Sequence, residues 1–358
     1  MLLSIENLRT YFYSRSRRAF VRSVDGASLS VGRGETLGVV GESGSGKTVA
    51  ALSAAGLVAG SPGVIGGRIE LKSRNLLDGI ERYVKVEERD GRVMAAEKDE
   101  RGWGRQVRRL MSGVRGKEIA MIFQNPRAAL NPYSTVGAQL VETIRLHTNL
   151  KGKHEAKDKA LHWLERVRID SPRLRFDSYP FGMSGGMCQR AMIAMALCAE
   201  PSLLIADEPT TGLDATIQAR IVELLRELKD GTGITTLLIS HDISVIRRLA
   251  DRVAVMYAGT VVQSGTASQV LRPRDSRQHP YTAALLASVP SAETIRAKSA
   301  LQAIEGEVPD TTSVPRGCRF YGRCNRVTDA VRSRCANLEP PLSEIEPGHK
   351  LRCWLHAA

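Results

Sequence analysis

One glycine-rich stretch, Gly41-Glu-Ser-Gly-Ser-Gly-Lys-Thr48, constrains the fold more than any other part of the sequence. The apolar residues 36–40 before it predict a buried strand, and residues 49–55 after it predict a helix. In this context the glycines let the loop turn its backbone N–H groups and a helix N-terminus toward a polyphosphate. Lys47 can reach the β- and γ-phosphates, and the Thr48 hydroxyl can ligate Mg²⁺. The sequence therefore predicts a nucleoside triphosphate site made by Gly41, Ser43, Gly44, Ser45, Gly46, Lys47 and Thr48.

The composition narrows the class of protein. Hydrophobic residues make up 42% of the 358 residues and charged residues 25%, which is typical of a globular chain. No apolar run approaches the ~20 residues that span a bilayer, and Glu6 and Arg9 interrupt the apolar N-terminus, which argues against a signal peptide. We therefore expect a cytosolic chain. The net charge of +13 suits a nucleic-acid or membrane-facing surface as well as an ordinary solvated one.

A second buried strand ends in two carboxylates. Residues 202–206 are mainly apolar and are followed by Asp207 and Glu208. Ligands bind at the carboxyl ends of strands in open α/β sheets. Asp207 is therefore placed to hold Mg²⁺ through water, and Glu208 to polarise an attacking water.

Two further strands end in polar side chains. Residues 118–123 predict a strand that leads into Gln124, just before a loop broken by proline. Residues 235–240 predict another, which is followed by His241. The amide of Gln124 can reach a metal or a water, and the imidazole of His241 can contact the γ-phosphate or that water.

Two other stretches carry candidate contacts to a nucleotide. A predicted helix begins at Ser184, Gly185 and Gly186, and its first turn offers unpaired N–H groups to an anion. Three aromatic residues end the first strand, and a flat ring can stack on an adenine or pack in the core. Which of them stacks is left open among Tyr11, Phe12 and Tyr13.

The composition also suggests how the chain is divided. We expect one nucleotide-binding domain over residues 1–265, with a helical subdomain over about 125–200, where apolar residues recur at helical spacing. The polar stretch at about 72–117 is predicted to be a partly helical surface insertion. Residues 266–358 are expected to form a separate extension, because proline, arginine and serine cluster at its start.

These motifs, in this order, resemble those of the ATPase subunit of ABC transporters. The matching segments are Gly41–Thr48 (Walker A), Gln124 (Q-loop), Met183–Met187 (signature), Leu203–Asp207 (Walker B), Glu208 (catalytic glutamate), Asp214 (D-loop) and His241 (switch histidine). Phe12 best fits the position of the family's adenine-stacking aromatic. The resemblance implies a P-loop α/β fold with an antiparallel β subdomain, a helical signature subdomain and a small, loop-rich C-terminal extension.

Finer features resemble the ATPases of oligopeptide/dipeptide importers. They are the segment at 123–132, the signature at 184–190 and His279-Pro-Tyr-Thr-Ala-Ala-Leu-Leu in the extension. Met183 and Met187 replace the generic Leu and Gln of the signature, and Met187 is usual in this subfamily. Cys188 stands where these relatives often have arginine, which puts a phosphate or coupling contact at that position in doubt.

Four cysteines crowd into the last part of the chain, with the spacing C-x₅-C-x₁₀-C-x₁₇-C. They are Cys318, Cys324, Cys335 and Cys353. Cytosolic thiols do not suggest disulfides, and four of them in a poor core suggest a metal that helps it fold. The resemblance favours a [4Fe–4S] cluster over structural Zn²⁺ or unliganded thiols. His349 and His356 are weaker candidates, since four cysteines already complete a site.

The resemblance also implies a mechanism and partners. Two such domains meet head to tail, and each ATP lies between one chain's Walker A and the other's signature. The second domain would be a homologous, different ATPase subunit. The dimer would drive two transmembrane permease subunits that receive solute from an extracytoplasmic binding protein, so the chain is expected at the cytoplasmic face of the membrane.

Two other classes of function remain open. A soluble ABC-type ATPase acting on DNA or ribosomes would use the basic surface, but such proteins usually carry two cassettes or a long coiled coil, and this chain has one Walker A motif; we expect no nucleic-acid partner. A redox or iron sensor would change its ATPase activity with the state of the cysteines. The solute itself is not determined, because peptide, glutathione and metal-chelate importers share this ATPase type.

Overall fold

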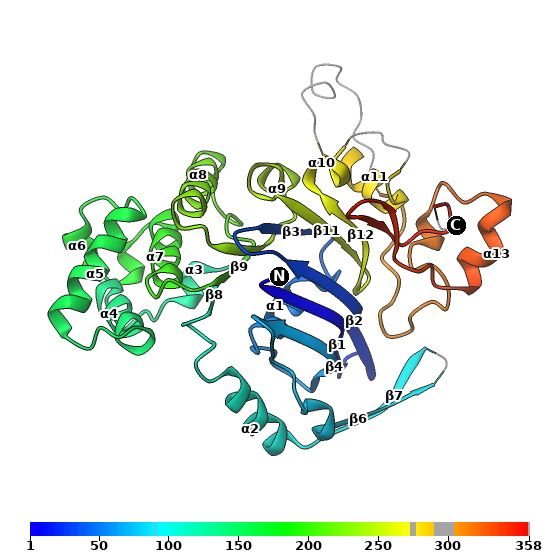
Figure 1. The fold of residues 1–358 in the computed structure, drawn as a ribbon, viewed down its shortest axis with the longest axis horizontal. Coiled ribbons are helices and arrows are strands. Elements are labelled where there is room, and N and C mark those ends of the chain that lie inside the picture. Colours follow the sequence, from blue (N-terminus) through cyan, green and yellow to red (C-terminus); the bar gives the residue numbers. More distant parts are fainter. Residues whose placement is uncertain (90, 273–276, 290–303, 357–358) are drawn as a thin grey trace. The chain divides into compact units, whose positions relative to one another are not determined.

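The computed structural model describes residues 1–89, 91–272, 277–289 and 304–356 (Figure 1). The chain folds into two compact units. The first comprises Met1–Ser30, Leu37–Leu110 and Ser240–Ala358, and the second comprises Val31–Thr36 and Met111–Ile239. The predicted boundary near residue 266 marks a change in composition, whereas the first compact unit runs across it.

The N-terminal strands form an antiparallel sheet in the order β2-β1-β4-β5. Its strands are β1 (Leu3–Ser14), β2 (Ala19–Val31), β4 (Pro62–Leu71) and β5 (Arg74–Asn75). Leu3 lies opposite Leu71 and Ile5 opposite Ile69, and all four side chains are buried, so this alternation sets the register. The antiparallel β subdomain that the resemblance implied is therefore present.

A second set of strands in the first unit carries the glycine-rich loop. β3 (Thr36–Val40) is buried throughout and pairs in parallel with β11 (Arg252–Tyr257). The order continues through β12 (Thr260–Thr266) to β14 (His349–Leu351) and β13 (Ser343–Glu346), all antiparallel. The C-terminal extension thus adds two strands beside the hairpin β11–β12.

The helical parts of the first unit are short. They are α1 (Lys47–Ala54), η1 (Ile80–Tyr83), α2 (Glu100–Met111), α9 (Ile243–Leu249), α10 (Ala267–Val270), α11 (Pro280–Ala287), η3 (Tyr321–Arg323) and α13 (Asp329–Asn337). None of the helices within the described ranges is long and apolar enough to cross a bilayer.

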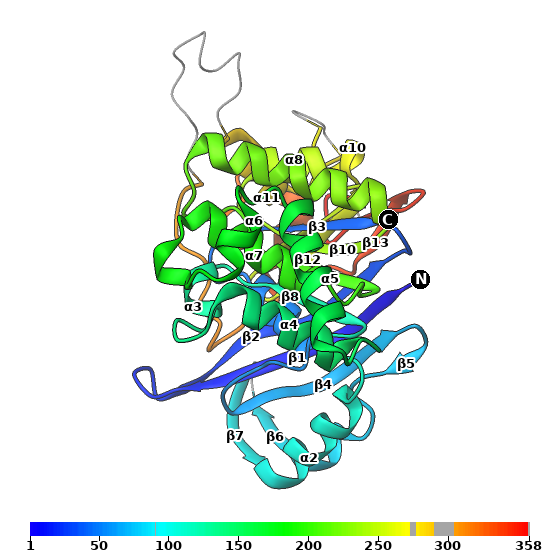
Figure 2. The ribbon, with the colours of Figure 1, turned by 90° about the vertical axis from the view of Figure 1, so that its left-hand side faces the viewer.

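The polar stretch at 72–117 contains the predicted helix, α2, and a β-hairpin that the sequence did not predict. The hairpin pairs β6 (Val84–Arg89) with β7 (Arg92–Lys98) and lies beside β4 (Figure 2). Its strands consist mostly of charged and small residues, and only Val84 and Val93 are buried. Such a pattern gives little period-two hydrophobic signal.

The second unit combines three parallel strands with helices. β8 (Ile119–Ile122) and β10 (Thr235–Ile239) both pair in parallel with β9 (Leu203–Asp207). Its helical segments are α3 (Pro126–Ala129), α4 (Val136–His147), α5 (Lys153–Arg166), α6 (Pro172–Phe176), η2 (Pro180–Gly182), α7 (Gly185–Leu197) and α8 (Ala215–Thr232). The predicted strands and the predicted helical character of about 125–200 are present.

A buried ionic cluster fastens the C-terminal extension to the N-terminal strands. Arg319 donates to Asp25 Oδ2 at 2.8 Å, and both side chains are 6% exposed. Asp25 Oδ1 also accepts from Tyr11 Oη at 2.6 Å and from Arg22 at 2.9 Å. Burial alone would raise the pKa of Asp25, but Arg319, the Tyr11 hydrogen bond and Arg22 outweigh it and lower that pKa.

Replacing Asp25 by Asn should lower the free energy of unfolding by about 3 kcal/mol, because the guanidinium of Arg319 would lose its most buried ionic partner. Urea unfolding at pH 7 measures this. Since the folded pKa of Asp25 is lowered, its contribution is complete above about pH 4 and is lost as the pH falls through the folded pKa.

The matched control is Asp310→Asn, which breaks the ion pair with Arg17. The side chains of Arg17 and Asp310 are 58% and 59% exposed. It should cost less than about 1 kcal/mol. An equal loss of unfolding free energy in the two variants would show that the buried cluster stabilises the fold no more than an exposed ion pair does.

Candidate functional site

The glycine-rich loop lies against two backbone carbonyls of its own unit. A Cβ on Gly41 would be 2.2 Å from the Met256 carbonyl oxygen, and one on Gly46 would be 2.3 Å from that of Ser23. Their φ angles are +151° and +97°, which side-chain-bearing residues rarely adopt. Glycine is therefore required at both positions. Ser43, Gly44 and Thr48 are exposed, so the outer face of the loop is open to a ligand.

Lys47 begins α1 and folds back over the loop. Its Nζ donates to the carbonyl oxygens of Gly41 and Glu42 at 2.8 Å each, and to Ser45 Oγ at 3.3 Å. The side chain is only 6% exposed. The loop thus holds the ammonium group in place with neutral acceptors, which a phosphate oxygen of higher charge can replace.

Gln124 and Glu208 meet in the second unit. Gln124 Nε2 donates to Glu208 Oε2 at 2.8 Å, and Thr211 Oγ1 donates to the same oxygen at 2.9 Å. Glu208 follows β9 with a φ of +47°, in the left-handed region, where a residue other than glycine is uncommon and often functional. Asp207, at the end of β9, is 4% exposed. Sequence reasoning missed Thr211, which carries no motif signal.

The signature segment caps a helix. The Ser184 hydroxyl accepts from the Met187 N–H at 3.3 Å and begins α7, with Gly185 and Gly186 in its first turn. Ser184 is exposed, whereas a Cβ on Gly186 would lie 2.8 Å from Ile217. Asp214 is likewise exposed and caps α8 through the Ile217 N–H.

Cys188, the departure from the subfamily pattern, is fully buried. Its thiol donates to the Pro180 carbonyl at 3.5 Å, and burial raises its pKa. It therefore behaves as a packed, neutral side chain and not as a substitute for arginine.

The first unit holds the other candidates. His241 follows β10 and is exposed. Tyr11 is completely buried and its hydroxyl donates a hydrogen bond to Asp25, so its ring offers no face to an adenine. Tyr13 is 49% exposed and packs edge-on against Phe20 with ring centroids 5.1 Å apart. Phe12 is half-buried and remains the predicted adenine contact.

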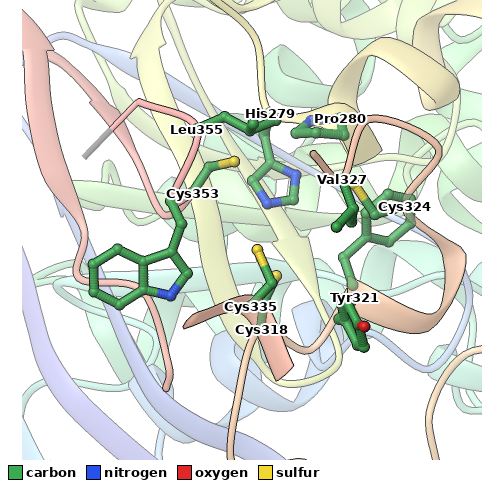
Figure 3. Close-up of a pocket in the computed structure, with 11 residues that line it drawn as sticks. His279, Pro280, Cys318, Tyr321, Cys324, Val327, Cys335, Cys353 and Leu355 are labelled. Carbon is green, nitrogen blue, oxygen red and sulfur yellow. The ribbon is translucent and has the colours of Figure 1, made fainter. Parts of the chain in front are cut away.

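The four C-terminal cysteines line one pocket with His279, which precedes them in the sequence (Figure 3). The Cys318 N–H donates to the Cys335 carbonyl at 2.8 Å, which brings α13 beside the turn that carries Cys318 and Cys324. All four thiols are free, and they do not form disulfides.

Burial raises the pKa of all four thiols, to about 12 for Cys318 and about 11 for Cys353. Neutral thiols are therefore favoured there unless a metal stabilises the thiolates. An all-cysteine set suits a [4Fe–4S] cluster or tetrahedral Zn²⁺. The donor chemistry fits, although in the described part of the chain no three His, Cys, Asp or Glu side chains are arranged as they would be around a bound metal.

His279 is a poor ligand in this arrangement. It is buried, and burial lowers its pKa to about 3, so it is neutral. Its Nδ1 accepts the Tyr281 N–H at 3.1 Å, which commits one ring nitrogen to capping α11. His349 is buried in β14, where its Nε2 lies 2.9 Å from Gln263 Nε2.

Two family models match the chain. Residues 24–211 match the model described as "ABC transporter", and residues 263–330 match "Oligopeptide/dipeptide transporter, C-terminal region". The chain is 42% identical over 356 residues to the "Probable peptide ABC transporter ATP-binding protein y4tR" of Sinorhizobium fredii, covering 99% of this chain and 95% of that protein. It is 39% identical over 358 residues to the "Oligopeptide transport ATP-binding protein AppD" of Bacillus subtilis, with 99% and 97% covered.

Solved structures show the same fold. A dimeric ATP-binding cassette bound to ADP and phosphate has a TM-score of 0.59 at 21% identity, covering 74% of this chain and 98% of that one. An ABC transporter component of Clostridium perfringens has a TM-score of 0.55 at 24% identity, with 75% and 90% covered. The full-length relatives and both family models show that the chain belongs to the ABC transporter family, as an ATP-binding subunit of the oligopeptide/dipeptide transporter type.

Proposed function

We propose that this chain hydrolyses ATP to drive the import of di- and oligopeptides through a membrane ABC transporter. The observation that carries the proposal is the combination, in one chain, of an ABC cassette with a C-terminal region of the oligopeptide/dipeptide type. The names of the full-length relatives support peptides over glutathione or metal chelates as the solute.

The loop residues hold the nucleotide. The backbone N–H groups of Gly41, Ser43, Gly44, Ser45 and Gly46 surround the phosphates, and Lys47 exchanges its loop carbonyl acceptors for phosphate oxygens. Phe12 stacks on the adenine. Thr48, Gln124 and Asp207 are the residues that would hold Mg²⁺. When bound, Mg²⁺ neutralises charge that develops on the phosphate oxygens.

Glu208 is the general base. It accepts a proton from water as the water oxygen attacks the γ-phosphorus and the bond to the β–γ bridging oxygen breaks. The hydrogen bonds from Gln124 and Thr211 to one carboxylate oxygen fix the orientation of the carboxylate. His241 contacts the γ-phosphate, and its neighbour Asp242 caps α9 through the Ser244 N–H.

The signature acts on a nucleotide held by a second chain in this scheme. Ser184, Gly185, Gly186 and Asp214 would contact ATP held by a homologous second ATPase subunit in a head-to-tail dimer. Two permease subunits and an extracytoplasmic binding protein complete the transporter, which places this chain at the cytoplasmic face of the membrane. The basic surface has no nucleic-acid role in this scheme.

Glu208→Gln should reduce the kcat for ATP hydrolysis by about 10²- to 10⁴-fold, because the amide cannot accept the proton. The Kd for ATP should change less than about threefold, because the amide keeps the size of the side chain. Phosphate release and equilibrium ATP binding measure the two effects. Glu227→Gln, on the exposed face of α8, is the matched control. Turnover near that of the unaltered chain would remove Glu208 from the role of base.

Cells that lack this chain should lose uptake of labelled short peptides, because transport requires hydrolysis. The unaltered gene should restore uptake, whereas the Glu208→Gln gene should not. If peptide uptake persists while uptake of another solute disappears, the proposed solute is wrong. ATPase stimulation by nucleic acid without any transport defect would favour the soluble-ATPase alternative.

We also propose that Cys318, Cys324, Cys335 and Cys353 hold a [4Fe–4S] cluster, with Zn²⁺ as the alternative. Support comes from the shared pocket and from its all-thiol donor set. A bound metal would replace protons on these thiols and fasten together the segments that carry them. This role is structural or regulatory, and no step of ATP hydrolysis passes through it.

Protein purified without oxygen should contain about four irons and four acid-labile sulfides per chain. Cys335→Ala should lose both, because it removes one of four ligands. Cys198→Ala, which removes a buried thiol at the end of α7, should retain them. Elemental and sulfide analysis with a visible spectrum measures this. One zinc per chain would establish the alternative, and absence of metal would reject both.

A further inference from the structure

One residue of the phosphate loop, Glu42, is held by the C-terminal region at two points. Its backbone N–H donates to Tyr281 Oη at 2.8 Å. Its carboxylate accepts from Arg323 at 2.9 Å and 3.3 Å, a two-pronged ion pair between residues 281 positions apart. Its carbonyl oxygen accepts from Lys47 Nζ and from the Ser45 N–H. Glu42 therefore joins the extension to Lys47, the lysine proposed to bind the phosphates.

The guanidinium of Arg323 is also held by hydrogen bonds to groups other than Glu42. Its side chain is 8% exposed, and it donates to the carbonyls of Ile304 and Glu305 and to Tyr257 Oη. Nearly all N–H donors of the guanidinium are thus satisfied in one geometry. A planar guanidinium can make this set of hydrogen bonds, whereas a lysine ammonium cannot. The 24% exposure of Glu42 leaves the pair only weakly screened by solvent.

A cluster of aromatic rings supports both contacts. The ring centroids of Tyr257 and Tyr281 lie 4.6 Å apart, and Phe320 lies 5.3 Å and 5.5 Å from them. Tyr257 ends β11, which pairs with the strand that leads into the loop. The hydroxyl of Tyr281 and the turn that carries Arg323 are therefore packed on the same strands as the loop itself.

Other ion pairs already fasten the extension without touching the loop. Arg319 does so through Asp25, and Arg17 does so through Asp310. The contacts to Glu42 differ from these because the backbone of Glu42 is part of the phosphate-binding turn. Their removal would change the conformation of that turn as well as the attachment of the extension.

We propose that Arg323 and Tyr281 are positioning residues for ATP hydrolysis, which hold Glu42 and thereby keep the phosphate loop and Lys47 in the conformation that receives ATP. The inference rests on the proposed role of Gly41–Thr48 in binding phosphates. A loop ordered in advance binds with a smaller loss of conformational entropy. ATP affinity should therefore depend on two residues that lie outside every nucleotide motif.

The test measures the Kd of Mg·ATP, the KM and the kcat on the full-length chain, together with the midpoint of thermal unfolding. Tyr281→Phe removes only the acceptor of the Glu42 N–H and keeps the ring in its cluster. Arg323→Ala removes the ion pair. Each should raise the Kd and KM for ATP, by about threefold for Tyr281→Phe and about five- to tenfold for Arg323→Ala, with kcat changed less.

Three further substitutions separate positioning from general stability. Arg323→Lys should recover part of the affinity, since it keeps the charge and loses the fork. Arg323→Ala and Glu42→Gln should be non-additive in Kd, because both break the same pair. Arg17→Ala, which removes an exposed pair to the extension, should leave the Kd unchanged.

Lys47→Ala distinguishes failure of this inference from failure of the proposed site. If Lys47→Ala binds ATP normally, the loop is not the phosphate site and the proposed function fails. If it loses binding while Tyr281→Phe and Arg323→Ala keep the Kd and KM of the unaltered chain, the positioning role is wrong and the site stands. A lower unfolding midpoint without any change in Kd would likewise overturn the positioning role. Should Arg323→Ala not fold, Tyr281→Phe decides.

Discussion

The close approach of the phosphate loop to two backbone carbonyls is the constraint on which the rest of the first unit depends. Gly41 lies against Met256 and Gly46 against Ser23, at distances that no side chain could occupy. The loop is consequently fixed to the end of β11 and to β2. With the loop in that place, Lys47 folds back over it and Ser43, Gly44 and Thr48 face outward. The carbonyls thus determine where a phosphate can bind.

The C-terminal extension is part of this arrangement. It adds β13 and β14 beside β12, pairs Arg319 with Asp25, and brings Arg323 and Tyr281 to Glu42. The same short turn, η3, lies between Cys318 and Cys324 and ends in Arg323. The region that matches the oligopeptide/dipeptide family model is therefore in direct contact with the loop proposed to bind ATP. No local pattern in the sequence predicts this contact.

The second unit contains an equally local arrangement around Glu208. Its left-handed backbone and its hydrogen bonds from Gln124 and Thr211 hold one carboxylate at the end of a buried parallel strand. Such a carboxylate keeps a defined direction without a ligand, which would reduce the reorganisation needed in the proposed reaction. The motif predicted Gln124 and Glu208 separately, and the fold joined them by a hydrogen bond.

The sequence by itself determined the family, the strands and helices that carry the motifs, and the residues proposed to bind ATP, because these depend on local spacing and on residue chemistry. The hairpin β6–β7 was missed because its charged strands have little hydrophobic alternation, and the role of Tyr11 was left open because residue type does not reveal burial. Only the tertiary structure decided that Tyr11 donates a hydrogen bond to Asp25, that the four cysteines share one pocket, and that Arg323 pairs with Glu42. Such contacts follow from how strands and turns pack, and a single sequence carries no local pattern that specifies them.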